Sequence, residues 1–567
     1  MKHRLLFPLV LLAGFAATAH AELRLMASAT SDSYQSLTYG LSAFCQAAGF
    51  PFALTEINDK ASELLLIPNL AGIDVQRHLW LFWLAGIPDD PQAPDVVSVA
   101  ILPATDNATA ALHALTNTYP LCIEEPEQHL WRYQQPALPL NPKKSIAPVI
   151  YVAVHRGMVI VSVAREAVLW AINRPMPAPP AGASTVAGQV RFEFQPSMIA
   201  PFLAEKRDRP ETSAPSSDVP ERMLADIRAL TLVLEATTEG VTARLSVTPV
   251  PDTRLARLFL RIRPPAKSFW ELCPEQAAVA MAGGGSSIWR IPDTYGSNRT
   301  SRARNAETLL GDCRTGDSAV FIGRISATGA LYYAEIMGIT NRAVAWDRAQ
   351  ADPPSLLPFE TSFRFASNST RMVQGTPVLD LIRGGFAAPT DGRRNPADMA
   401  AFMVRDGGIS VAATSNHLVV TFGPSNAIEQ VLQHLANPPA TALPLPVRCR
   451  KLLPDLPDAP CSAVMLQPAG LVRQIALSLP GLKQEWIADL PQPGDGIAAA
   501  ITRNADNVLH LTLRVSANEV SRLTEFMNKG HKALQELFMQ MALQQMLQIE
   551  RKLDAVDPRD PKRQLQR

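Results

Sequence analysis

The sequence predicts an α+β fold: two tandem copies of an antiparallel sheet, each with helices packed on one face, followed by a long C-terminal helix. Three observations support this fold class. Segments of matching pattern recur in the same order, displaced by roughly 265 residues. Apolar and polar residues alternate along the strand-like segments, which are separated by turn sequences. Residues 523–553 carry an apolar stripe at helical spacing.

The first repeated element is a strand, then an amphipathic helix, then a proline stop. Its two copies are 158–163, 164–172 and 174–177 in the first half, and 418–422, 425–435 and 437–439 in the second.

Two further elements follow in both halves. A strand that ends in Gln-Pro occupies 190–196 and again 463–468, and each copy leads into an apolar-patterned helix. Hairpins follow at 232–247 and 498–515, with turn-forming residues between their strands. Because the order of the three elements is preserved, we interpret the chain as a tandem duplication.

The remaining strands are expected to complete an antiparallel sheet in each copy, with the interposed helices covering one face. These strands are 96–102, 150–154 and 159–163 in the first copy, and 319–325, 330–337 and 409–413 in the second. Stretches rich in Pro, Ala and Ser indicate surface loops or linkers at 174–188, 207–221 and 437–460.

The N-terminus has the pattern of a removable signal peptide. Lys2 and Arg4 precede an apolar run over 5–17, and Ala19-His20-Ala21 is a cleavage pattern. The alternative, a membrane anchor, needs about 20 apolar residues, and this run is shorter. We therefore expect export to the periplasm or the extracellular space, with the mature chain starting near Glu22.

The predicted organisation has five parts. They are a signal peptide (1–21), a first α+β unit (22–264), a second α+β unit (265–525), a C-terminal amphipathic helix (526–553) and a disordered tail (554–567). The boundary between the units is placed at the Pro264-Pro265 pair, which stops the preceding helix.

Charge and hydropathy exclude some partners. With 53 basic and 52 acidic residues, the chain has no net field to attract nucleic acid or an anionic membrane. After Glu22, no stretch free of charges and prolines is long enough for a transmembrane helix.

Six cysteines in an exported chain permit disulfides. The short loop between Cys449 and Cys461 makes them the best candidate pair. Because no two cysteines form a Cys-x-x-Cys motif, a zinc knuckle or thioredoxin-like redox site is not expected. We predict no metal and no cofactor.

The C-terminal helix has two interpretations. It could pack on its own sheet, or it could bind a partner or a second copy, because methionine-rich faces adapt to different surfaces. The candidate partner-binding residues lie on its apolar stripe: Met527, Leu534, Phe538, Met541 and Met546.

Sequence motifs of common enzymes are missing, among them His-Glu-x-x-His, the phosphate-binding loop, Gly-x-Gly-x-x-Gly and Gly-x-Ser-x-Gly. Three fragments resemble sites but have simpler interpretations. Gly316-Asp317-Ser318 is interpreted as a polar turn, the glycine-rich 283–287 as a flexible loop, and the group Glu124, Glu125, Glu127 and His129 as a solvated acidic loop.

Duplication without a catalytic signature favours an exported, non-catalytic envelope protein that binds or scaffolds a partner protein or an envelope polymer. One alternative is a carrier that holds an apolar ligand between sheet and helices. Another is a hydrolase with an unrecognised site, for which Ser318 and His129 are the candidates that can be named.

Overall fold

The computed structural model describes most residues between 23 and 527. The described segments are 23–49, 56, 58–59, 65, 67–85, 96–105, 108–119, 121–125, 129–134, 149–174, 189–197, 199, 219–285, 309–325, 329–356, 363–386, 408–438, 443–478, 490 and 492–527. The predicted signal peptide (1–21), most of the predicted C-terminal helix (526–553) and the tail (554–567) lie outside them.

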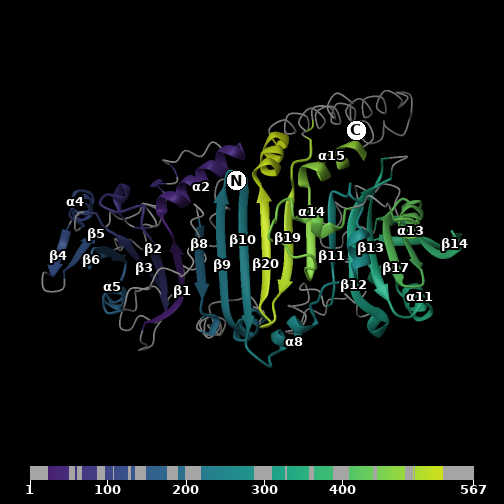
Figure 1. The fold of residues 1–567 in the computed structure, drawn as a ribbon, viewed down its shortest axis with the longest axis horizontal. Helices are drawn as coiled ribbons and strands as arrows, with labels where there is room; N and C mark the ends of the chain where they lie inside the picture. Colours follow the sequence, from purple (N-terminus) through teal and green to yellow (C-terminus); the bar gives the residue numbers. More distant parts are fainter. Residues whose placement is uncertain are drawn as a thin grey trace, which may run out of the picture.

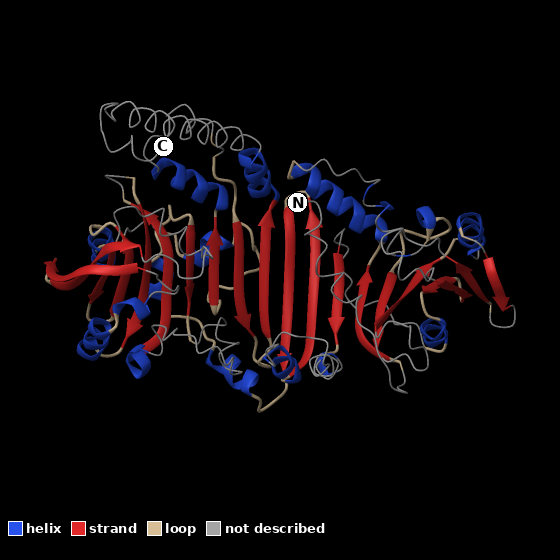
Figure 2. Cartoon of the chain, turned by 180° about the vertical axis from the view of Figure 1, so that it is seen from behind, coloured by secondary structure: helices blue, strands red, loops and turns tan. Residues whose placement is uncertain are grey.

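Twenty strands of the described chain form one continuous antiparallel sheet (Figures 1 and 2). In the first half they are β1 (Arg24–Ser31), β2 (Leu79–Ala85), β3 (Val96–Pro103), β4 (Leu121–Glu125), β5 (Leu130–Gln134), β6 (Val149–His155), β7 (Met158–Ser162), β8 (Gln189–Phe194), β9 (Ile227–Thr237) and β10 (Gly240–Pro249). In the second half they are β11 (Val279–Gly283), β12 (Arg314–Arg324), β13 (Leu331–Ile339), β14 (Phe363–Val373), β15 (Thr376–Phe386), β16 (Gly408–Ala413), β17 (His417–Gly423), β18 (Ser462–Leu466), β19 (Ile497–Arg503) and β20 (Leu509–Ser516).

The strand pairings run in one line from β4 to β14. The order is β4-β5-β6-β7-β3-β2-β1-β8-β9-β10-β20-β19-β18-β11-β12-β13-β17-β16-β15-β14. The pairing pattern in the second half is that of the first with each number raised by ten. For example, β1 pairs with β2 and β8, and β11 pairs with β12 and β18.

The two halves meet at the antiparallel pair β10–β20, in which Arg244 lies opposite Thr512 and Ser246 opposite His510. The Ser246 Oγ and the His510 Nδ1 are 2.9 Å apart. This pair corrects the predicted fold class. The expectation of two separate tandem sheets is wrong, because main-chain hydrogen bonds continue the sheet from one half into the other.

The helices and helical turns lie between the strands in sequence. They are α2 (Tyr34–Ala47), α4 (Thr109–Thr118), α5 (Arg165–Ile172), α7 (Val219–Ala225), α8 (Arg254–Arg261), α11 (Arg342–Ala351), α13 (Ala427–Ala436), α14 (Leu445–Cys449) and α15 (Pro468–Ser478), with 3₁₀ turns η1 (Pro68–Leu70), η4 (Lys267–Glu271), η6 (Gly311–Cys313) and η7 (Pro353–Leu356). Residues 517–527 are also helical.

Capping side chains fix where several helices begin. The Thr253 hydroxyl accepts from the N–H of Ala256 at the start of α8, and the Asn341 amide oxygen accepts from the N–H of Val344 at the start of α11. Along α8, Leu255, Leu258 and neighbouring apolar residues are buried at helical spacing.

One face of the sheet carries α5 and α13, and we call it the α5/α13 face. Here Ala167 and Val168 of α5 pack on strand residues of the first half, whereas Ile428 and Val431 of α13 pack on those of the second. This face can be traced across the sheet from β7 to β17 through residues that are paired on neighbouring strands. In order they are Ile160, Ile101, Trp80, Thr30, Arg191, Val233, Arg244, Thr512, Ala500, Ala463, Ala282, Ala319, Ile336 and Val419.

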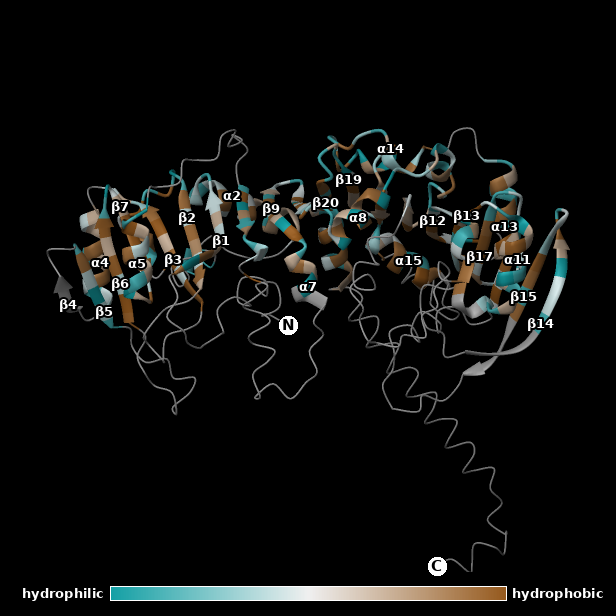
Figure 3. Ribbon diagram, turned by 90° about the horizontal axis from the view of Figure 1, so that it is seen from below, coloured by the Kyte–Doolittle hydropathy of each residue, from teal (hydrophilic) through white to brown (hydrophobic). Residues whose placement is uncertain are grey.

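The other face carries α4 and α11, and we call it the α4/α11 face. Ala111 and Leu115 of α4 lie in its core in the first half, and Ala345 and Ala349 of α11 in the second. The prediction of helices on one face only is therefore wrong. The strands β2, β3 and β6, which are hydrophobic along much of their length in Figure 3, are covered on both faces.

Among the described residues, the middle of the sheet is less covered than its ends. On the α5/α13 face it is polar, with Arg191 and Arg244 among its residues, whereas on the α4/α11 face it is apolar, with Phe192, Leu232 and Leu511 half-buried. Helix α2 crosses the ends of β8 and β9 (Figure 1). The two faces therefore offer different chemistry at the junction.

Part of a predicted loop is core instead. Within 437–460, α14 places Leu445 and Cys449 in the main core of the second half, together with Leu452, Leu453 and Leu456. Helix α14 can approach the sheet closely because the strand residues on this face are small, among them Ala280, Ala463 and Ala498.

The predicted long C-terminal helix is described only at its start, up to Met527, and no long C-terminal helix is evident among the described residues. No described helix is both long and apolar enough to cross a membrane.

Candidate functional site

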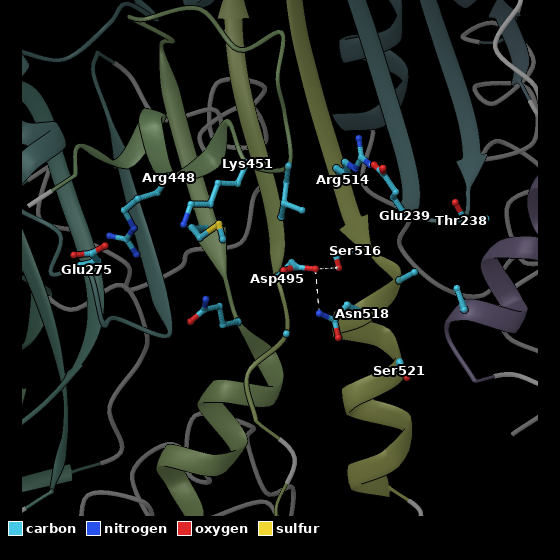
Figure 4. Close-up of a pocket in the computed structure, with 16 residues that line it drawn as sticks. Thr238, Glu239, Glu275, Arg448, Lys451, Asp495, Arg514, Ser516, Asn518 and Ser521 are labelled. Atoms are coloured by element: carbon cyan, nitrogen blue, oxygen red, sulfur yellow. Dashed lines mark hydrogen bonds and ion pairs between the residues drawn. The ribbon is translucent and has the colours of Figure 1, made fainter.

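The candidate site is a pocket of about 740 Å³ where the two halves meet, at the ends of β9, β10 and β20 (Figure 4). Two of its lining residues, Arg514 of β20 and Met465 of β18, lie on the α5/α13 face. The pocket therefore opens beside the polar middle of that face. Its lining comes from both halves: Ala47, Thr238, Glu239, Glu275, Arg448, Lys451, Leu452, Met465, Gln467, Gly494, Asp495, Arg514, Ser516, Ala517, Asn518 and Ser521.

An ion pair joins the two halves at one side of the pocket. The Arg514 guanidinium on β20 donates to the Glu239 carboxylate at the β9–β10 turn, with Nη2 2.7 Å from Oε2. The Arg514 side chain is 17% exposed whereas that of Glu239 is 80% exposed, so solvent screens the pair and we assign it little stability. Its effect is to fix a positive and a negative group at the rim.

Helix α14 and the turn that follows it supply the positive groups of the opposite wall (Figure 4). The buried Arg448 donates through Nη1 to the carbonyls of Cys273 (3.3 Å) and Pro274 (3.0 Å), and burial lowers the pKa of its guanidinium. Lys451 is exposed one turn later, and it makes no ion pair with another described residue. Lys451 is therefore the cation that this wall presents to a ligand.

Asp495 organises the floor of the pocket. Its Oδ2 accepts from the Ser516 hydroxyl (3.3 Å) and from the Asn518 amide (3.1 Å), as Figure 4 shows. These bonds hold the segment that precedes β19 against the end of β20. Asp495 is exposed, so its second oxygen can accept from a ligand.

A buried glutamate supports this floor from behind. Glu519 is fully buried, and its Oε1 accepts from the Ala469 N–H (2.6 Å) at the start of α15. Burial raises the pKa of the Glu519 carboxyl, and backbone N–H groups partly offset that rise. A Cβ at Gly494 would lie 2.8 Å from the Glu519 Oε2, so the close approach there requires glycine.

The lining residues determine which chemistry the pocket can offer a ligand. Its described lining residues include the serines Ser516 and Ser521 but no histidine, so they do not form a serine-histidine pair. Within the described part of the chain, no three His, Cys, Asp or Glu side chains are placed to hold a metal. Among the described lining residues, three cations and three carboxylates surround a cavity large enough for a polymer segment or small molecule.

The Gly316-Asp317-Ser318 fragment is structural. Asp317 is buried, pairs with the Arg263 guanidinium at 2.9 Å and accepts from the N–H of Ala266 at 3.3 Å. It therefore fastens the proline-bearing link between the halves to β12. Ser318 lies on β12 between Gly283 and Met337, away from the pocket.

In the glycine-rich segment 283–287, the described glycines allow close packing against the chain near Arg263. A Cβ at Gly284 would meet the Arg263 carbonyl at 2.6 Å, and Gly285 has φ +80°. Glu124 and Glu125 lie on β4, His129 has a positive φ of 49°, and Glu127 falls outside the described residues.

Cys449 and Cys461 are both free thiols, so the structure does not contain the disulfide expected between them. The Cys449 Sγ is 3.5 Å from the Val464 carbonyl, whereas the Cys461 Sγ is 3.9 Å from the Ile262 carbonyl. Burial raises the pKa of the Cys449 thiol to about 12.

Of the candidate partner-binding residues only Met527 is described, and it is 62% exposed. The others, Leu534, Phe538, Met541 and Met546, lie outside the described residues.

Sequence reasoning missed every residue of the pocket. Asp495, Ser516 and Asn518 come together only because β19 and β20 pair, and Glu239 reaches Arg514 only across the β10–β20 junction. The only local sign was polar side chains at the ends of two predicted hairpins.

Comparison with known proteins gives no relative: no family model, no curated protein and no solved structure matches the chain.

Proposed function

We propose that this protein is an exported, non-catalytic binding protein of the cell envelope that holds a partner protein or an envelope polymer at the junction pocket. The observation that carries the proposal is the pocket itself. It presents groups of both charge signs, several of them fixed by hydrogen bonds or ion pairs before any ligand arrives. Such preorganisation reduces the entropy cost of binding.

The chemistry of the pocket indicates what the partner carries. Lys451 on one wall favours a carboxylate or another anion, and the free oxygen of Asp495 favours an amide or hydroxyl donor. A partner that carries both acidic and amide groups, such as an acidic peptide segment or a peptide-bearing polymer, satisfies both.

Charge reversal at Lys451 tests this proposal. Full-length mature protein would be used to capture binding partners from envelope extract, with Lys451→Glu compared against the wild type. We expect capture of the specific partner to fall at least tenfold. The matched control is Lys267→Glu, an exposed lysine outside the pocket. Equal capture by the wild type and both variants would count against the pocket as the binding site.

A second candidate function is carriage of an apolar ligand, favoured by the opposite face at the same junction. There Leu513 is 37% exposed in the interior of the sheet, and neighbouring Phe192, Leu232 and Leu511 are half-buried. Native mass spectrometry of the purified protein separates the two functions, because a carrier retains bound lipid and a binding protein of the first kind does not.

A further inference from the structure

A second cavity, of about 230 Å³, lies in the second half of the molecule between α13, α15 and strands β12 and β13. It is separate from the junction pocket, with which it shares no lining residue. Its walls include Phe321 and Val431 of the main core. The cavity is therefore built into the folded core of this half.

Two amide oxygens in this cavity lack a hydrogen-bond donor. The Oε1 atoms of Gln430 on α13 and Gln474 on α15 are buried and have no partner among the described residues. The orientation of the Gln474 amide is set by its other end, since Nε2 donates to the Gln276 carbonyl at 3.4 Å. Buried acceptors without a donor are costly, so two in one cavity indicate a missing ligand with N–H groups.

A tyrosine hydroxyl lines the same cavity. The Tyr332 ring packs edge-on against Phe321, with ring centroids 6.1 Å apart, and Tyr332 is only 3% exposed. A Cβ on Gly323 would lie 2.6 Å from the Tyr332 hydroxyl oxygen, so only glycine leaves room for the phenol in this position. The hydroxyl can donate as well as accept.

The charges around the cavity restrict the ligand further. Its described lining residues include no carboxylate and two basic residues, His434 of α13 and Arg324 at the end of β12, whose Nε donates to the Gly329 carbonyl at 3.0 Å. A purely cationic ligand would have no counter-ion there. A carboxylate can pair with the remaining guanidinium N–H groups of Arg324.

We propose that this cavity binds a small zwitterion of amino-acid size, with its amino group on the Gln430 and Gln474 oxygens and its carboxylate toward Arg324. The proposal is independent of the junction pocket. The Tyr332 hydroxyl completes the polar contacts, and Phe321 and Val431 contact the apolar part of the ligand.

The test is calorimetric titration of the full-length mature protein with each of the proteinogenic α-amino acids in turn. We expect at least one to bind with a Kd below about 1 mM. Gln430→Leu should weaken that binding at least tenfold. The matched control is Gln433→Leu, the same change at an exposed position on the same helix, which should bind like the wild type.

Two further measurements keep the proposal separate from misfolding and from the junction pocket. Gln430→Leu should have an unchanged or higher Tm without ligand, because it removes a buried amide that lacks a partner. Lys451→Glu should bind the amino acid normally. The proposal is overturned if no amino acid binds the wild type, as for a cavity that holds only water, or if Gln430→Leu and Gln433→Leu bind equally well.

Discussion

Glu519 shows how a single side chain holds the junction pocket together. It is fully buried at the start of the last described helix, and it binds the first turn of α15 through the N–H of Ala469. The floor residues Ser516 and Asn518 lie within three positions of it. For a carboxyl in this position, hydrogen bonds from backbone N–H groups offset part of the free-energy cost of burying its charge.

The pH dependence of stability tests this description of Glu519. Because its folded pKa is raised, the folded state holds the proton to higher pH than the unfolded chain does. Its contribution to stability is therefore complete at acidic pH and decreases as the pH rises through the folded pKa. Glu519→Gln keeps an acceptor for the Ala469 N–H but has no charge to bury.

Thermal unfolding between pH 4 and pH 8 would provide the measurement. We expect the difference in Tm, Glu519→Gln minus wild type, to increase as the pH rises. Glu193→Gln, at an exposed site on β8, is the control and should show no such trend. A constant difference between Glu519→Gln and the wild type over the whole range would show that Glu519 is not buried as described.

At the scale of single elements, the close packing of α14 depends on small strand residues. Ala463 and Ala498 on the α5/α13 face have no exposed surface, and they share a core with Leu445 and Cys449 of α14. The adjacent Ala499 points to the other face, opposite Leu513, and is half-buried. A larger side chain should therefore be tolerated at Ala499 but not at Ala498.

Two substitutions one residue apart test this packing. Ala498→Leu should lower the free energy of unfolding by about 1–3 kcal/mol, because the added carbons have no space in the core that Ala498 shares with α14. Ala499→Leu should have a much smaller effect, since its face is partly open. Chemical denaturation measures both, and equal losses would contradict the placement of α14.

Strands and hairpins could be predicted because their signals are local. The predicted hairpins at 232–247 and 498–515 are confirmed as β9–β10 and β19–β20, and the predicted strand at 96–102 as β3. Alternation and turn residues suffice for such elements. Helix α14 was missed because the prolines of 437–460 resemble a loop, although its leucines are buried.

At the scale of the whole molecule, the sequence could not reveal that the sheet is continuous. Val241, Ala243 and Leu245 alternate with polar residues along β10, as they would in an edge strand, and nothing local marks β20 as their partner. Coverage on both faces was also missed, although Val96–Pro103 is almost uninterruptedly apolar, which is typical of a strand buried on both sides.

The function proposed for the junction pocket depends on this continuity. Glu239 belongs to the first half and Arg514 to the second, and the β10–β20 pair brings them to 2.7 Å. If the halves did not join here, the pocket would not exist.

Disulfide cross-linking across the junction tests this central claim most directly. Ser246 and His510 lie opposite each other with their side chains in contact, so Ser246→Cys combined with His510→Cys should form a bond within one chain under mild oxidation. The control pair, Ser246→Cys with Arg514→Cys, is displaced by four residues along β20 and should not. Continuity of the sheet across β10 and β20 is contradicted if the first pair fails to cross-link, or if it links only between chains.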